Sequence, residues 1–311
     1  MYVVNTYLSQ KLLLLGLVMF CSCNVVQWQQ EKSVQILANR SVQEAYFETD
    51  SLRLHYFEGG EGPVIVFIHG FAADALASWS RYLYKYSKDY RVIALDILWF
   101  GESTAQIEPN LENQVSAVMQ LLDHLEVDTY SVVGQSYGGF ISYGLALKDS
   151  VRLKKMCIAN CPGVTYDVSL LDDIRIENDL EHISDLFVFD SEVGLKRFYE
   201  MFFYSNLPIP EWLFKQVRNK YFNANGVQKK QLMSSLPLDQ LKYMEAQVDS
   251  SLERIVIWGD EDKLFPLPEG EKLAKYLNCD LYNIPKAGHV SHIDRYRAFS
   301  AILDKFLKDE K

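Results

Sequence analysis

The sequence predicts an α/β fold, in which a mostly parallel sheet is covered by helices on both faces. Short runs of apolar residues without polar alternation are typical of strands that are buried on both faces. Such runs recur along the chain, and stretches with helical periodicity lie between them. Strands that alternate with helices form parallel sheets, so this alternation is the main ground for the prediction. It stops near residue 163 and resumes near residue 254, which indicates an insertion.

The first elements are expected to form an antiparallel hairpin. Two β-rich runs, at residues 43–49 and 52–57, flank the turn-forming pair Asp50-Ser51. Continuous apolar runs then predict strands at residues 64–68, 92–95, 131–133, 156–159, 255–258 and 281–284. Helical patterns lie at residues 110–125, where Asn110 is a suitable N-cap, and at residues 136–148, 268–277 and 295–308.

The chain is expected to divide into a core and a cap. Residues 41–163 and 251–311 would form the α/β core, and residues 164–250 a helical cap. The insertion combines helix-forming residues with many aromatic ones, including the run at residues 197–204. An insertion between two strands of such a sheet is well placed to cover a binding site. We therefore expect a lid over the carboxyl edge of the sheet.

Residues 1–23 are expected to be an export signal. Lys11 precedes an apolar run at residues 12–20, and Cys21-Ser22-Cys23 follows it, an arrangement that resembles a secretory signal. The cysteines also fit a lipoprotein signal, in which a cysteine becomes the lipidated first residue. A plain secretory signal and an uncleaved anchor stay open as alternatives. We expect an exported protein that is periplasmic, secreted, or attached to a membrane through a lipidated N-terminal cysteine.

Charge and cysteine content exclude two classes of protein. The chain has 31 Lys and Arg residues against 41 Asp and Glu residues, a formal net charge of −10, which disfavours binding to the phosphates of nucleic acids. After residue 23 only Cys157, Cys161 and Cys279 occur, too few for a disulfide scaffold. The sequence therefore predicts a globular body that folds without disulfides.

The strongest motif is Gly134-Gln135-Ser136-Tyr137-Gly138, a G-x-S-x-G sequence that follows a predicted strand and opens a predicted helix. At such a sharp turn the serine hydroxyl projects above the sheet, and the flanking glycines avoid collisions that side chains would cause. A glycine-rich turn with an idle serine is the structural alternative. The strand-turn-helix setting favours a nucleophile at Ser136.

A nucleophilic serine needs a general base, and His289 is the candidate. It follows the last predicted strand, in a loop at the carboxyl edge of the sheet, whereas the nearby His292 is its closest competitor. His55, His69 and His124 lie on predicted strands or helices. A buried histidine with a structural hydrogen bond is the alternative for each of them.

The acid of the site is expected to be Asp262, directly after the strand at residues 255–258. It would orient the imidazole and stabilise the imidazolium. The neighbouring acids Asp260 and Glu261 and the weaker rival Asp96 stay open as alternatives. The chain order Ser136, Asp262, His289 matches one of the three common serine-triad orders.

Two backbone N–H groups are expected to form an oxyanion hole. The helix that begins after Ser136 places the N–H of Tyr137 near the negative charge that develops during acyl transfer. The second donor is expected from the loop after the strand at residues 64–68. Gly70 permits a close backbone approach there, and the N–H of Phe71 is the candidate. Phe71 could also serve as a wall of the pocket.

From about residue 46 onward, the chain resembles the α/β-hydrolases with an inserted cap, and among them bacterial lipases and esterases similar to monoacylglycerol lipases. The matching motifs are His69-Gly70-Phe71, Asp96 with Phe100-Gly101-Glu102-Ser103, the glycine-rich turn at 134–139, residues 258–262 and Gly288-His289. The resemblance implies the nucleophile, acid and base already named. One departure is Leu98-Trp99, which stands where Pro-Gly is usual and would reshape the loop beside the pocket.

The expected activity is therefore hydrolysis of carboxylic esters with apolar acyl chains through an acyl-enzyme. The same triad could instead act on a thioester, a lactone, an amide or a carbon–carbon bond, and a catalytically silent ligand-binding protein is a third interpretation. No metal-binding or phosphate-binding motif occurs, so neither a cofactor nor a metal is expected. The expected partner is a small apolar ester or lipid, and neither nucleic acid nor a protein partner is implied.

Overall fold

The computed structural model describes residues 24–161, 163–167, 169–189, 191–205, 209–244 and 246–308. The export signal that was expected at residues 1–23, with Cys21 and Cys23, lies outside this part of the chain. None of the helices in the described ranges is both long enough and apolar enough to cross a membrane.

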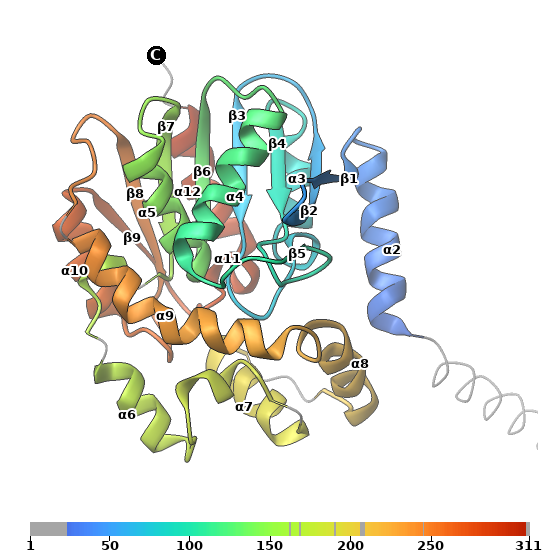
Figure 1. Ribbon diagram of the computed structural model, residues 1–311, viewed down its shortest axis with the longest axis vertical. Coiled ribbons are helices and arrows are strands. Elements are labelled where there is room, and N and C mark those ends of the chain that lie inside the picture. The colour runs from blue at the N-terminus through green and yellow to red at the C-terminus, as the bar shows by residue number, and fades with distance from the viewer. Residues whose placement is uncertain are drawn as a thin grey trace, which may run out of the picture.

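The described residues contain one nine-stranded sheet, in the order β1-β2-β4-β3-β6-β7-β8-β9, with β5 paired to β2 (Figure 1). The strand β2 pairs antiparallel with β1, β4 and β5, whereas all pairs from β4 across to β9 are parallel. The strands are β1 (Gln43–Glu48), β2 (Leu52–Gly59), β3 (Val64–Ile68), β4 (Arg91–Leu95), β5 (Thr104–Ala105), β6 (Tyr130–Gln135), β7 (Leu153–Ala159), β8 (Glu253–Gly259) and β9 (Asp280–Ile284). The predicted hairpin and the mostly parallel sheet are confirmed.

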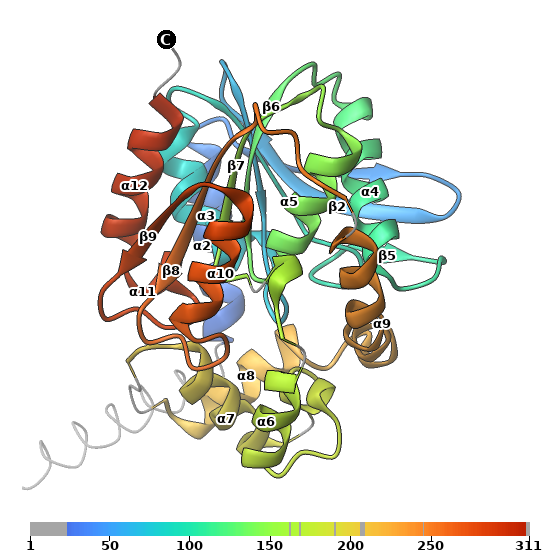
Figure 2. The same cartoon turned by 90° about the vertical axis from the view of Figure 1, so that its left-hand side faces the viewer.

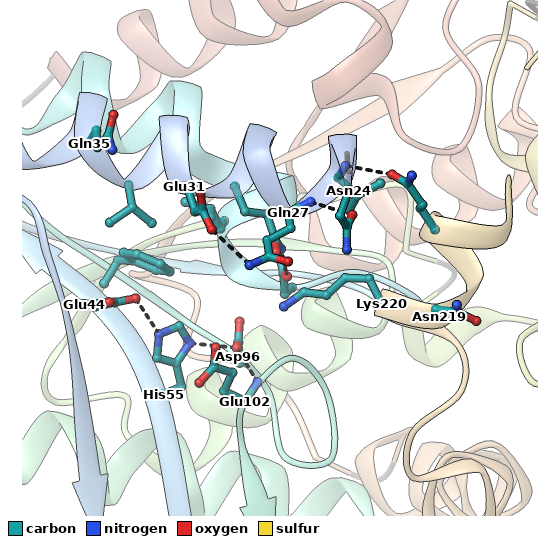
Figure 3. Close-up of a pocket in the computed structure, with 17 residues that line it drawn as sticks. Asn24, Gln27, Glu31, Gln35, Glu44, His55, Asp96, Glu102, Asn219 and Lys220 are labelled. Atoms are coloured by element: carbon teal, nitrogen blue, oxygen red, sulfur yellow. Dashed lines mark hydrogen bonds and ion pairs between the residues drawn. The ribbon is translucent and has the colours of Figure 1, made fainter. Parts of the chain in front are cut away.

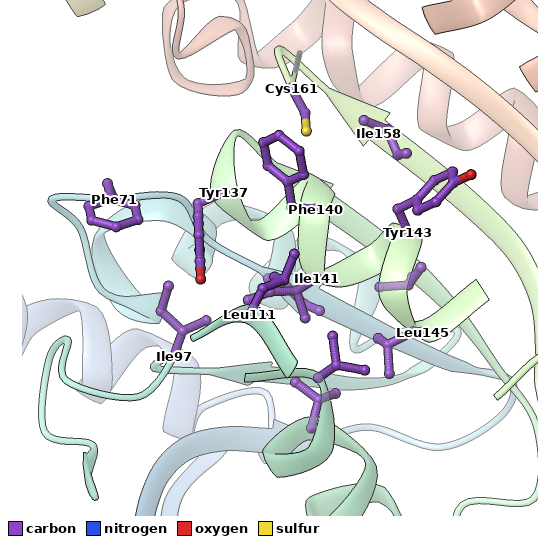
Figure 4. Close-up of a cluster of buried hydrophobic side chains, with 14 of the residues drawn as sticks. Phe71, Ile97, Leu111, Tyr137, Phe140, Ile141, Tyr143, Leu145, Ile158 and Cys161 are labelled. Atoms are coloured by element: carbon purple, nitrogen blue, oxygen red, sulfur yellow. The ribbon is translucent and has the colours of Figure 1, made fainter. Parts of the chain in front are cut away.

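Helices cover both faces of this sheet, as predicted. They are α2 (Val25–Ala38), α3 (Ala75–Tyr86), α4 (Leu111–His124), α5 (Tyr137–Lys148), α10 (Leu267–Leu277), α11 (Ser291–Asp294) and α12 (Tyr296–Lys308). The central strand β3 sends alternate side chains to two cores. Val66 and Ile68 join the core that α4 and α5 cover, part of which Figure 4 shows. Ile65 and Phe67 join the core beneath α3 and α12. Both faces of β3 are therefore buried, which explains its unbroken apolar sequence.

The sequence did not predict α2 or α3. In α2 polar residues interrupt the apolar ones, and Leu37 is the buried one within this fully described helix, so the sequence shows no apolar stripe. In α3 the buried face is largely aromatic, with Trp79, Tyr82 and Tyr86. Aromatic residues have modest helix propensity, so the sequence carries no clear helix signal here. Tertiary packing stabilises this helix.

Between β7 and β8 the chain leaves the sheet and forms short helices. They are the 3-10 helices η1 (Gly163–Thr165) and η2 (Ile183–Leu186) and the α-helices α6 (Ser169–Glu177), α7 (Glu192–Phe202), α8 (Glu211–Tyr221) and α9 (Gly226–Met244). Figures 1 and 2 show α6 to α9 gathered at one end of the sheet. A helical insertion therefore lies where the sequence places one. The division into a core and a cap at residues 164–250 stays an interpretation.

Candidate active site

The parallel register brings four loops together at one edge of the sheet. Ile68 pairs with Gly134 across β3 and β6, and Gln135 pairs with Ala159 across β6 and β7. On the other side Gly259 pairs with Ile284 across β8 and β9. The residues that follow these strand ends include all those predicted for the site, Phe71, Ser136, Tyr137, Asp262 and His289.

Ser136 occupies a strained turn between β6 and α5. Its backbone has φ 54° and ψ −122°, a conformation that costs energy for a residue with a side chain. The turn leaves no room beside it, because a Cβ on Gly138 would lie 2.3 Å from the carbonyl oxygen of Ile68, and one on Gly134 would lie 2.2 Å from that of Gly138. The G-x-S-x-G spacing is therefore a steric requirement of this turn.

The side chains of Ser136, His289 and Asp262 form a continuous hydrogen-bonded line. The Oγ atom of Ser136 lies 2.9 Å from Nε2 of His289, and Nδ1 of His289 lies 3.0 Å from Oδ2 of Asp262. An ionised carboxylate only accepts hydrogen bonds, so Nδ1 carries the proton and Nε2 accepts from the serine hydroxyl. All three residues are at most 8% exposed. This arrangement can activate a serine nucleophile.

The acid is held by further hydrogen bonds. The Oδ1 atom of Asp262 accepts from the backbone N–H groups of Leu264 and Phe265, at 3.0 and 2.9 Å. Its Oδ2 atom also accepts from Nδ2 of Asn160, at 2.8 Å, and Ser291 donates to the amide oxygen of Asn160. These contacts fix the carboxylate in the orientation that His289 requires.

Asn160 and Ser291 were missed by the sequence analysis. Asn160 directly follows β7, so its position at the carboxyl end of a parallel strand was the available signal. Ser291 is two residues after His289, and nothing in its type distinguishes it from other loop serines.

The loop after β3 lies against the serine turn. A Cβ on Gly70 would be 2.8 Å from Cβ of Ser136, so only glycine allows the two backbones to come this close. The rings of Phe71 and Tyr137 meet edge to face, with centroids 4.8 Å apart, and lie side by side in Figure 4. Tyr137 is the first residue of α5, where a backbone N–H has no partner within the helix. The roles of Phe71 and Tyr137 as oxyanion donors stay predictions.

The other histidines have different surroundings. The ring of His292 packs against that of Trp79, with centroids 4.6 Å apart and planes tilted by 33°, and neither of its ring nitrogens has a hydrogen-bond partner among the described residues. Burial, together with the charge of His289, lowers the pKa of His292 to about 3. His69 donates from Nδ1 to the carbonyl of Gly70, and its Nε2 accepts from the N–H of Ile97. Neither histidine touches the serine hydroxyl.

The alternative acids also lie elsewhere. Asp260 and Glu261 are exposed. Asp96 contacts Nδ1 of His55, at 2.8 Å, and accepts from the N–H groups of Ala75 and Glu102. The carboxylate that reaches His289 is that of Asp262.

An apolar cavity of about 230 Å³ opens onto Ser136 and His289. Its walls come from the loop after β3, the start of α3, and the helices α7 and α8. Aromatic and aliphatic residues dominate it, namely Phe71, Leu195, Phe198, Tyr199, Phe202, Phe203, Ile209, Phe214, Val217, Tyr221, Phe222, Val290 and Ile293. Among the described residues that line it, none is a lysine, an arginine, an aspartate or a glutamate.

Leu98 and Trp99, which depart from the resembled family, do not line this cavity. Both are buried, and Trp99 has φ 69°. The backbone of Leu98 exchanges two hydrogen bonds with the side-chain amide of Gln114, and Asn225 donates to the carbonyl of Trp99. This loop connects to α9 rather than to the substrate space.

Among the described residues no group of three or more His, Cys, Asp or Glu side chains is placed to hold a metal ion. The cysteines in this part of the chain, Cys157, Cys161 and Cys279, are free.

Comparisons with known proteins agree with this geometry. A family model described as alpha/beta hydrolase fold matches residues 63–296. The 2-hydroxymuconate semialdehyde hydrolase of Pseudomonas sp. strain CF600 is 26% identical over 269 residues, which covers 83% of this chain and 91% of that protein. The 2-hydroxy-6-oxo-2,4-heptadienoate hydrolase of Pseudomonas putida is 23% identical over 264 residues, covering 81% and 91%.

Solved structures show the same fold. A membrane phospholipase A, described as a bacterial virulence factor, superposes with a TM-score of 0.73 at 21% identity and covers 97% of this chain and 98% of its own. A variant of a meta-cleavage product hydrolase superposes with a TM-score of 0.71 at 22% identity, covering 85% and 98%.

These comparisons correct the expected localisation. The sequence predicted an exported protein, but three curated relatives that align with more than 80% of the chain are hydrolases of 2-hydroxymuconate semialdehyde and of 2-hydroxy-6-oxo-dienoates, and none of these three is named as an exported enzyme or a lipoprotein. The prediction of export was wrong. It rested on the short apolar run at residues 12–20 and on two cysteines, and hydrophobicity alone does not distinguish such a run from other apolar segments.

Proposed function

Since the chain belongs to the alpha/beta hydrolase family, we propose that it is a serine hydrolase that cleaves small carboxylic esters with apolar acyl chains. The observation that carries the proposal is the line from Ser136 through His289 to Asp262 at the base of an apolar cavity. Hydrolase chemistry is common to the named relatives. The proposal goes beyond this shared chemistry in two respects, the ester bond and the apolar acyl chain.

The residues take the following roles. The Oγ atom of Ser136 attacks the ester carbonyl while Nε2 of His289 accepts its proton, and Asp262 stabilises the imidazolium. The backbone N–H groups of Phe71 and Tyr137 hold the oxyanion of the tetrahedral intermediate. The imidazolium then returns the proton to the leaving alcohol. Water, deprotonated by His289, attacks the acyl-enzyme and releases the acid and the free serine.

The cavity supports an apolar and compact substrate. Its volume of about 230 Å³ is below the roughly 300–1,000 Å³ of sites that enclose drug-sized ligands. Its described walls offer aromatic and aliphatic surface, which favours burial of a hydrocarbon chain or ring. We therefore propose a short to medium acyl chain in this space, as in a small esterase, with monoacylglycerol-like esters as the longest substrates.

The second candidate is hydrolysis of a carbon–carbon bond next to a ketone, which the similarity to the 2-hydroxymuconate semialdehyde hydrolase favours. The 2-hydroxy-6-oxo-dienoates carry a carboxylate, and a buried carboxylate without a cationic partner is costly. No lysine or arginine occurs among the described residues that line the cavity. The cavity chemistry therefore favours the neutral ester.

A substrate panel separates the two candidates. The wild-type protein is assayed with p-nitrophenyl esters of increasing acyl length and with a 2-hydroxy-6-oxo-dienoate, beside Ser136→Ala. We expect ester hydrolysis that is lost in the variant, with an optimum at short or medium acyl length and little turnover of the dienoate. A kcat/KM for the dienoate above that for every ester would contradict the proposal and establish the carbon–carbon hydrolase instead.

A further inference from the structure

Helix α2, which precedes the region matched by the family model, is anchored to the core at its C-terminal end. Leu37 is 1% exposed and packs in the same core as Val42 and the aromatic face of α3. The rest of the helix carries polar or half-exposed side chains in this fully described segment. Its N-terminal end extends toward α8 (Figure 1).

The N-terminal half of α2 is held by hydrogen bonds to two different parts of the molecule. The side-chain amide of Gln30 donates to Oδ2 of Asp74, at 3.0 Å, and to the hydroxyl of Tyr221 on α8, at 3.3 Å. The backbone N–H of Val26 donates to Gln216, also on α8, at 3.2 Å. One amide group of α2 therefore joins the start of α3 to the helical insertion.

Beneath this half of α2 lies a second cavity, of about 690 Å³. Its lining is mixed: the charged or titratable Glu31, Glu44, His55, Asp96 and Lys220 (Figure 3) lie beside the apolar Val26, Val34, Phe57 and Leu76. The N-terminal half of α2 therefore spans an open space, and none of its side chains is fully buried in the core. A movement of this half away from the core would uncover no fully buried residue of α2, so the hydrogen bonds of Gln30 and Val26 carry much of the resistance to it.

One partner of Gln30, Tyr221, lines the catalytic cavity, and the other, Asp74, adjoins residues that line it. Asp74 directly follows Ala72 and Ala73, which line that cavity, and it caps α3 by accepting from the N–H of Ala77 at 2.7 Å. Tyr221 lines the cavity from the side of α8. The distance between these two walls determines how closely the cavity encloses an acyl chain.

We propose that α2 is a strap that holds α8 against the α3 side of the catalytic cavity, and that Gln30 is the positioning residue that joins the two. The inference rests on the proposed function, because enclosing an apolar acyl group is what the closed cavity achieves. If the strap is released, a smaller fraction of the free enzyme is in the closed form, and the apparent affinity for substrate falls by that fraction. A bound acyl chain still closes the cavity, so the chemical steps keep their rate.

The test compares Gln30→Leu with Gln35→Leu. Leucine is similar in size to glutamine but lacks the amide, and Gln35 is an exposed residue of the same helix that lines the same second cavity. For a p-nitrophenyl ester we expect the KM of Gln30→Leu to rise about tenfold, with kcat per titrated active site within about twofold of wild type. Gln35→Leu should keep both constants. A role of Gln30 in stability alone would lower the melting temperature and the number of active sites while leaving KM unchanged, and that result would overturn the proposal.

A double-mutant cycle with Tyr221→Phe tests the contact itself. This variant keeps the ring in the cavity wall and removes the hydroxyl that Gln30 contacts. In that background Gln30→Leu should raise KM by clearly less than in the wild type, because part of the interaction is already lost. Strictly additive effects would contradict a strap that acts through this contact.

Hydrogen exchange tests the strap without any substrate. In Gln30→Leu the amides of α8 should exchange faster, whereas those of β6 and β7 should keep their rates. Unchanged exchange in α8 would overturn the inference. If the wild-type protein hydrolyses no ester but α8 exchanges faster in the variant, the strap stands and the proposed function fails, so the two failures are distinguishable.

Discussion

The Oγ atom of Ser136 lies 2.9 Å from Nε2 of His289, although 153 residues separate them in the chain. The parallel register places both at the same edge of the sheet. Because Nδ1 of His289 faces Asp262, the nitrogen that faces the serine is the one free to accept a proton. Nucleophilic attack by Ser136 would depend on that relationship and on the groups that maintain it.

Asp262 is predicted to be the acid of the triad, and its exposed neighbour Asp260 is the matched control. Asp262→Asn should lower kcat for an ester roughly 10,000-fold, because an amide stabilises the wrong imidazole tautomer. Asp260→Asn should retain wild-type activity. Steady-state kinetics on both variants checks this, and a large loss in Asp260→Asn with activity retained in Asp262→Asn would reverse the assignment.

Asn160 is predicted to orient the acid. Its amide donates to Oδ2 of Asp262, and a hydrogen bond to a charged group contributes about 1.5–3 kcal/mol. Asn160→Leu should therefore lower kcat about 10- to 100-fold while KM changes little. The exposed Asn223→Leu in the helical insertion serves as the control. An Asn160→Leu variant with wild-type kcat would show that the backbone N–H groups of Leu264 and Phe265 alone hold the carboxylate.

Gly138 is predicted to be required for the serine turn. A Cβ there would lie 2.3 Å from the carbonyl oxygen of Ile68, so Gly138→Ala should lower the free energy of unfolding by about 2 kcal/mol or more and reduce ester hydrolysis. At Gly226, by contrast, a Cβ would meet only a side-chain atom of Val188, at 3.2 Å. Thermal or denaturant unfolding of both alanine variants measures the difference. Equal stability of the two would refute the steric argument.

His292 is predicted to make stability depend on pH. Burial lowers its pKa to about 3 in the folded protein, against about 6.5 in an unfolded chain. Between these values the unfolded state binds one more proton, so stability is lost as pH falls from about 6.5 toward 3, at about 1.4 kcal/mol per pH unit. His292→Phe keeps an aromatic ring against Trp79 and should flatten this slope by about that amount. Denaturant unfolding at pH 4.5 and pH 7 measures it, and parallel curves for the two proteins would contradict the prediction.

The sequence was sufficient to predict the sheet and the arrangement of Ser136, Asp262 and His289. Their signals are local: buried strands have unbroken apolar runs, and each candidate follows such a run. Asn160 was missed because its contact with Asp262, 102 residues away in the chain, joins the ends of two neighbouring strands, and a polar residue after a strand is common. Helix α2 was missed because polar contacts and one buried side chain hold most of it in place. Gln30 therefore became recognisable only when the structure placed it between Asp74 and Tyr221.

Asn160 and α2 were features that the sequence analysis missed, whereas export was a property that it predicted wrongly. An apolar run and two cysteines carry little positional information, whereas a catalytic motif combines residue type, spacing and the element on which it lies. The structure places Nδ1 of His289 3.0 Å from Oδ2 of Asp262, and their catalytic roles stay predictions. Residues 12–23 offer no comparable combination of residue type, spacing and element.

Labelling with a fluorophosphonate tests the central claim most directly. The reagent reacts with a serine only when a neighbouring base activates it, and the adduct is measured by intact mass and located by peptide mapping. We predict one adduct, on Ser136, in the wild-type protein, none in Ser136→Ala and a strongly slowed reaction in His289→Ala. A folded wild-type protein that forms no adduct, or one whose adduct lies on another serine, would contradict the catalytic triad described here.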